Sequence, residues 1–158
     1  MTDAAKRLTN LYLAAAVLGV LAGIAHFAIP LTSSLITVLG WIFDILIAVI
    51  VILIAVRSKR SGLGRAAMRA SYAGLIYSAI TGIANLLFPP SAAALRRAML
   101  QQSSTLTESQ MNAAISLTRS LGVRVGELII ALLFGWLIAL FVGWIASLFV
   151  QGGDSQAV

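Results

Sequence analysis

The sequence predicts an all-α fold: a four-helix transmembrane bundle with an extramembrane helical hairpin between helices 3 and 4. Hydrophobic residues make up 60% of the 158 residues and charged residues only 10%, whereas soluble domains are about 45–50% apolar and about 25% charged. Four apolar runs each approach the ~20 residues that cross a bilayer as a helix. These runs are apolar all round, without the alternation of a β-barrel strand. We therefore expect residues 1–158 to form a single integral membrane domain.

The four expected membrane helices are Leu11–Ile29, Leu35–Val56, Ala66–Phe88 and Leu128–Val150. A tight turn at Pro30-Leu31-Thr32 predicts that the first two are antiparallel. The third helix should end sharply, because Pro89-Pro90 cannot continue it. The first run continues through Phe27–Ile29, which favours a retained helix over a cleaved signal peptide.

Residues 91–119 form the largest segment outside the expected membrane helices. Ser91 can cap a short helix, and Thr107-Glu108-Ser109-Gln110 has the form of a capping box that starts a second one. A stripe at helical spacing follows: Met111, Ala114, Ile115, Thr118, Leu121, Gly122 and Val125. We expect a helical hairpin whose second arm continues without a break into the fourth membrane helix. The stripe fits the membrane surface, packing on the first arm of the hairpin, or a groove that binds a partner. Residues 151–158 should be disordered.

The basic residues predict the orientation in the membrane. Seven of the 11 Lys and Arg residues precede the first span or adjoin the loop between the second and third: Lys6, Arg7, Arg57, Lys59, Arg60, Arg65 and Arg69. The other four follow the third span: Arg96, Arg97, Arg119 and Arg124. Because basic residues mark the cytoplasmic side, both termini should be cytoplasmic, in what we expect to be a bacterial cytoplasmic membrane. The net charge of +6 is thus explained by topology and by attraction to anionic lipid, and we expect no nucleic-acid partner.

Small residues at four-residue spacing allow close approach of helices in lipid, where no hydrophobic force drives their association. Every expected membrane helix carries such a stripe. The glycines that we expect at helix contacts are Gly19, Gly23, Gly40, Gly74, Gly82, Gly135 and Gly143. The stripes predict a compact bundle, and they leave open whether some faces meet a second copy or a larger membrane complex.

Asp44 is the main candidate for a functional residue. It lies roughly 13 Å along the second membrane helix, at about 1.5 Å per residue, and ionisable groups at such depth are costly and often functional. His26, Asn85 and Glu127 are expected nearer the outer mouth of the bundle. The four residues form a candidate proton, cation or polar-network site. The alternative is a protonated Asp44 that makes one structural hydrogen bond, to Ser78, Tyr77 or Asn85.

Cofactors, metals and catalysis find little support in the sequence. The chain has no cysteine, which excludes disulfides and thiol chemistry. His26 with two carboxylates would supply three metal ligands, but no spacing motif unites them, so we expect no metal. Arg124 and Glu127 are spaced to form an i,i+3 ion pair. Phosphate-binding glycine loops, Gly-x-Ser-x-Gly and His-Glu-x-x-His are all missing from the sequence.

These observations predict a non-enzymatic accessory, assembly or interaction subunit that works through helix packing and the outer hairpin. The alternative is a small proton- or cation-coupled transporter or channel that uses the cluster around Asp44. A membrane enzyme acting on a lipid-like substrate ranks third. Access of water to Asp44 separates the first two, because transport needs a wet path to the acid and a scaffold does not.

Overall fold

The computed structural model describes residues 3–29, 33–58, 61–102 and 105–154, and over these residues the chain is all-α, with six helices and no strand. The helices are α1 (Asp3–Ala28), α2 (Ser34–Arg57), α3 (Leu63–Leu87), α4 (Ala92–Gln102), α5 (Glu108–Arg119) and α6 (Leu121–Asp154). Four of them, α1, α2, α3 and α6, are long and apolar enough to cross a membrane. The predicted helical class and the four apolar spans are thereby confirmed. The predicted turn at Pro30-Leu31-Thr32 lies outside the described residues.

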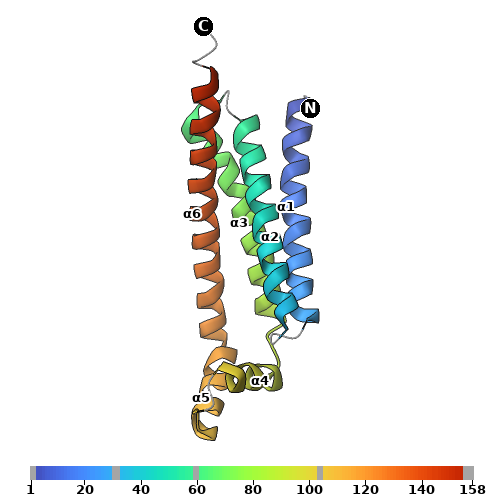
Figure 1. Cartoon of the computed structure of the whole chain (residues 1–158), viewed down its shortest axis with the longest axis vertical. Helices are drawn as coiled ribbons and strands as arrows, with labels where there is room; N and C mark the ends of the chain where they lie inside the picture. The colour runs from blue at the N-terminus through green and yellow to red at the C-terminus, as the bar shows by residue number, and fades with distance from the viewer. Residues whose placement is uncertain (1–2, 30–32, 59–60, 103–104, 155–158) are drawn as a thin grey trace.

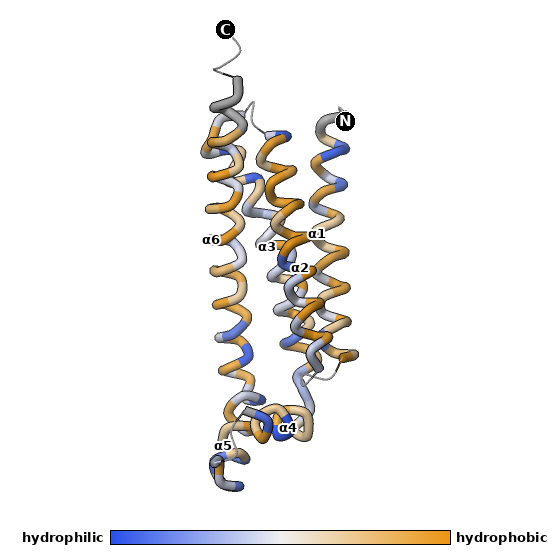
Figure 2. Tube along the Cα trace, viewed as in Figure 1, coloured by the Kyte–Doolittle hydropathy of each residue, from blue (hydrophilic) through white to orange (hydrophobic). Residues whose placement is uncertain are grey.

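The four long helices run side by side, and α4 and α5 lie at the end opposite the two termini (Figure 1). Helices α1, α2 and α6 are coloured mostly as hydrophobic and α3 is paler, whereas hydrophilic residues are found in α4, in α5 and near the helix ends (Figure 2). Helix α3 is central, since it contacts α1, α2 and α6. No contact joins α1 to α6 within the described residues, so the four helices do not close into a ring.

The ends of several helices follow from local capping. The Ser33 hydroxyl accepts a bond from the Leu35 amide at 3.2 Å, and that of Ser91 accepts one from the Ala94 amide at 3.1 Å. The capping box at the start of α5 is confirmed, because Thr107 and Gln110 each bond the other's backbone amide. All three caps satisfy amide donors that a helix start leaves without a partner.

One prediction about the last membrane helix is wrong. The chain does not run unbroken from α5 into α6, because Ser120 adopts an extended conformation with φ −64° and ψ 141°. Its hydroxyl then accepts a bond from the Val123 amide at 3.4 Å, so a serine that looked like one more helical residue acts as a helix start. Helix α6 ends at Asp154 and residues 155–158 lie outside the described part, so the disordered tail over residues 151–158 stays a prediction.

The core is built from small side chains, as close helix packing in lipid requires. Its buried members come from α1, α2, α3 and α6: Ala15, Val51, Ile54, Ala55, Ala70, Ala73 and Ala139. Six of the predicted packing glycines have atoms of another helix where a side chain would begin: Gly19, Gly23, Gly74, Gly82, Gly135 and Gly143. A Cβ on Gly23, for example, would lie 2.8 Å from the Cβ of Ala84.

Gly40 differs from these six glycines. Apart from its chain neighbours and its own helix backbone, no described residue has an atom within 4 Å of where its Cβ would be, and the residue lines a hollow between helices. The expectation that Gly40 packs against another helix is therefore wrong within this chain. The four-residue spacing of Gly40 with Asp44 and Ala48 marks the side of α2 that borders hollows, rather than a side that is filled by a neighbouring helix.

Candidate functional site

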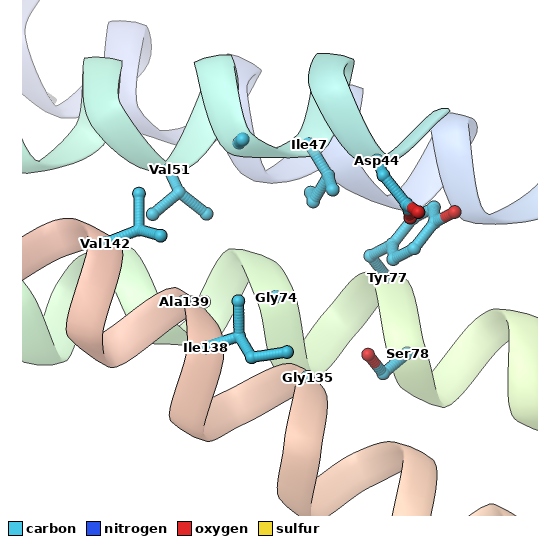
Figure 3. Close-up of a pocket in the computed structure, with 11 residues that line it drawn as sticks. Asp44, Ile47, Val51, Gly74, Tyr77, Ser78, Gly135, Ile138, Ala139 and Val142 are labelled. Atoms are coloured by element: carbon cyan, nitrogen blue, oxygen red, sulfur yellow. The ribbon is translucent and has the colours of Figure 1, made fainter. Parts of the chain in front are cut away.

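Asp44 borders a hollow of about 320 Å³ between α2, α3 and α6, which we call the Asp44 hollow (Figure 3). Its lining is Asp44, Ile47, Ala48 and Val51 of α2, Gly74, Tyr77 and Ser78 of α3, and Gly135, Ile138, Ala139 and Val142 of α6. Asp44 carries the only ionisable carboxyl group in this lining. Ile138 is 59% exposed, and Asp44 is exposed as well, so the hollow opens to the surface of the chain between α2 and α6.

The Asp44 carboxyl group lies beside the ring of Tyr77 (Figure 3). Within the described part of the chain no hydrogen bond or ion pair joins Asp44 to another residue. The structural hydrogen bond to Ser78, Tyr77 or Asn85, which the sequence left as an alternative, is therefore not formed among these residues. The acid lies at an opening in an apolar surface, and none of the described residues pairs a cation or a hydrogen-bond donor with it.

A second hollow, of about 190 Å³, lies between α1, α2 and α3; we call it the His26 hollow. Its lining is Ala22, Gly23, Ala25 and His26 of α1, Ile36, Gly40 and Phe43 of α2, and Tyr77, Thr81 and Asn85 of α3. The absence of a side chain on Gly40 leaves part of this space open. The hollow is more polar than the one at Asp44, because an imidazole, a phenol, a hydroxyl and an amide all border it.

A third hollow, also of about 190 Å³, lies at the α4–α5 end of the molecule; we call it the interface hollow. Its lining is His26, Asn85, Pro89, Pro90, Leu95, Thr118, Arg119, Arg124 and Glu127. It brings together the ends of α1 and α3 with α4, α5 and the start of α6. Three of the four predicted site residues, His26, Asn85 and Glu127, therefore meet here.

Shared lining residues connect the three hollows one after another. His26 and Asn85 line both the interface hollow and the His26 hollow, and Tyr77 lines both the His26 hollow and the Asp44 hollow. A line of polar groups thus leads from the α4–α5 end to Asp44. The sequence predicts for Tyr77 only a hydrogen bond to Asp44. Its spacing of three residues from Gly74, on a small-residue face, was the signal that it borders the same space.

The predicted ion pair between Arg124 and Glu127 is not formed. Arg124 instead extends toward α3, where its terminal nitrogen approaches the Asn85 carbonyl oxygen at 3.5 Å. Among the described residues an ion pair joins Arg96 to Glu108, between α4 and α5. Arg124 has two competing partners, Glu127 on its own helix and the Asn85 carbonyl group at the end of α3. An exposed ion pair such as that with Glu127 contributes little free energy, so the contact with α3 can replace it.

Among the described residues, no three His, Asp or Glu side chains come close enough together to bind a metal ion. Comparison of the chain with protein-family models, with curated proteins and with solved structures finds no match. The candidate site is therefore defined by its own geometry: an unpaired acid at a lateral opening, connected by polar side chains to one end of the molecule.

Proposed function

We propose that the protein is a small, non-enzymatic integral membrane subunit that binds a membrane-spanning helix of a partner protein. The binding face is the opening between α2 and α6 that contains Asp44, and the partner helix carries a Lys or Arg at that depth. The observation that carries this proposal is the exposure of Asp44 on an apolar surface, without a hydrogen-bond or ion-pair partner in the described chain.

The energy of an exposed acid within the bilayer supports a partner. A charged aspartate at the centre of a membrane helix costs about 2.5–3.5 kcal/mol on insertion scales, and lipid tails offer it no hydrogen-bond donor. The apolar lining of the Asp44 hollow continues toward a fourth hollow, of about 410 Å³, which is lined by Ile52, Val56, Val142, Ile145, Ala146 and Phe149. Val142 borders both, so one apolar face runs along α2 and α6.

Charge complementarity favours a different protein over a second copy. The basic residues of this chain lie toward the ends of the long helices, between α2 and α3, or in α4 and α5, and α2 has none before Arg57. A second copy in the same orientation would bring no cation to the depth of Asp44. A partner helix with a basic residue would pair with the acid and fill the hollow at the same time.

The orientation that we propose follows from the basic residues. Both termini and the α2–α3 connection face the cytoplasm, and α4 and α5 lie outside, in a bacterial cytoplasmic membrane. The absence of cysteine permits a direct test with single cysteine substitutions. A membrane-impermeant maleimide should label Ser116→Cys of α5 in intact cells, and should label Arg65→Cys of α3 only after the cells are opened. The reverse pattern contradicts the orientation.

The partner is tested by purifying the tagged protein from its native membranes into lipid nanodiscs, followed by quantitative mass spectrometry. We expect a membrane protein at constant stoichiometry with the wild type and at least ten-fold less of it with Asp44→Leu. Thr37→Leu is the matched control, because it removes another exposed polar group from α2 and should leave the partner bound. Equal recovery with Asp44→Leu and Thr37→Leu contradicts the proposal.

A second candidate is a proton or cation path, which the series of three connected hollows favours. In this account ions enter between His26 and Asn85, pass Tyr77 and bind at Asp44. It predicts ion flux into liposomes that contain the purified protein alone. Asp44→Asn should abolish this flux and Tyr72→Phe, at an exposed tyrosine of α3, should not. If the ion flux into liposomes with the wild-type protein equals that into protein-free liposomes, this candidate is excluded.

A further inference from the structure

We infer that the interface hollow binds the head group of a phospholipid, one whose phosphate is followed by a primary ammonium group. This inference requires the long helices to span a membrane but does not depend on the partner-binding face. The interface hollow and the Asp44 hollow share no lining residue, and they lie at different positions along the helices. The two sites can therefore be tested separately.

The guanidinium group of Arg124 is the first observation. Its Nε atom is enclosed and has no hydrogen-bond partner within the described part of the chain. One terminal nitrogen donates to the Asn85 carbonyl oxygen at 3.5 Å, which is at the limit of a hydrogen bond. Enclosed donors are nearly always satisfied, and a guanidinium fork matches the oxygens of a phosphate. A phosphate in the hollow would supply the missing acceptor.

The other polar groups of the hollow define two poles. Arg119 of α5 and His26 of α1 line it together with Arg124 of α6, so donors from three helices converge. Glu127 lines the same hollow and makes no ion pair with a described residue. A free phosphate would leave this carboxylate unpaired and would be repelled by it. A zwitterionic group would satisfy both poles, with its phosphate on the arginines and its ammonium on Glu127.

The surroundings of the hollow suit an amphiphile. Phe27 at the end of α1 and Phe88 at the end of α3 are 70% and 56% exposed, and their ring centroids lie 5.5 Å apart. These two exposed phenyl rings adjoin His26 and Pro89 of the hollow in sequence and offer apolar surface to the acyl chains of a lipid. The volume of the hollow is about 190 Å³. This is room for a phosphate with a short amine arm, while acyl chains remain in the bilayer.

Native mass spectrometry of the full chain in detergent tests the inference with three lipids of identical acyl chains. These are phosphatidylethanolamine, phosphatidylcholine and phosphatidylglycerol. We expect the wild type to bind phosphatidylethanolamine at least ten-fold more tightly than the other two, because the choline cannot donate to Glu127 and the glycerol carries no charge. Arg124→Gln should weaken the binding of phosphatidylethanolamine at least ten-fold. Glu127→Gln should make the affinities for phosphatidylethanolamine and phosphatidylglycerol equal.

Matched variants separate this site from general charge and from the partner face. Arg97→Gln removes a cation of α4 that does not line the hollow, and Asp44→Leu alters only the other site; both should bind phosphatidylethanolamine as the wild type does. Where Arg124→Gln does not fold, Arg124→Lys keeps the charge, loses the fork and should still weaken binding. Equal affinity for the three lipids, equal loss with Arg97→Gln, or displacement of the lipid by millimolar inorganic phosphate would overturn the inference.

Discussion

Gly143 of α6 lies directly against Ala70 of α3, and a Cβ on this glycine would lie 2.7 Å from the Cβ of the alanine. Ala67, one turn earlier on α3, closes the same space with its Cα at 3.4 Å. Both alanines are buried. The close approach of α3 and α6 thus depends on a missing side chain, as expected for helices that associate without a hydrophobic driving force.

Replacing this glycine should separate the two helices. Gly143→Leu should destabilise the protein by about 1–3 kcal/mol through overpacking, seen as a lower midpoint when heated detergent samples are assayed by size exclusion. Gly126→Leu is the control on the same helix, because among the described residues no atom outside its own helix backbone and chain neighbours lies within 4 Å of its Cβ position. It should be neutral or stabilising, since glycine is a poor helix former. Equal destabilisation by both variants would show that the contact does not govern stability.

The hydroxyl of Tyr12 should fasten α1 to α3. It donates a hydrogen bond to the Arg69 carbonyl oxygen at 2.8 Å, and the loss of such a bond costs about 1 kcal/mol. Tyr12→Phe should therefore lower the unfolding midpoint measurably in the same assay. Tyr72→Phe, at a tyrosine that is 47% exposed, should leave it unchanged. If the two variants behave alike, the hydrogen bond contributes nothing to stability.

The capping box should hold the first turn of α5. Thr107→Ala removes the acceptor for the Gln110 amide and should destabilise the helix start by about 1 kcal/mol. Hydrogen exchange of the first-turn amides should then accelerate roughly five-fold, the factor that corresponds to this free energy. Ser116→Ala, at an exposed position of the same helix, serves as control. Unchanged exchange in Thr107→Ala would show that tertiary contacts alone order this turn.

The fold class was predictable because composition and run length are properties of the sequence itself. The four spans follow from apolar runs of about the length that a bilayer requires, and the capping box at Thr107 follows from local chemistry. The break at Ser120 was missed, because a serine fits a helix interior or a helix start, and only the path of the chain decides between them.

The site was predictable only in part. The sequence indicated that Asp44, His26, Asn85 and Glu127 are unusual, but not which of them meet, because depth along a helix does not give the rotation of its neighbours. The hollows depend on that rotation. For the same reason Arg124 was assigned to Glu127, its neighbour in sequence, when its nearest acceptor belongs to the end of α3.

The central claim is that a partner helix occupies the opening beside Asp44, and site-specific photo-crosslinking in native membranes tests it most directly. A photoreactive amino acid at Ile138, which lines the Asp44 hollow, is compared with one at Leu137, which is exposed but lies outside it. We expect the photoreactive residue at position 138 to crosslink one partner protein, through a membrane-spanning peptide that contains Lys or Arg. Adding Asp44→Leu should abolish this crosslink. Crosslinks to lipid alone, or the same protein product from both positions, would contradict the account.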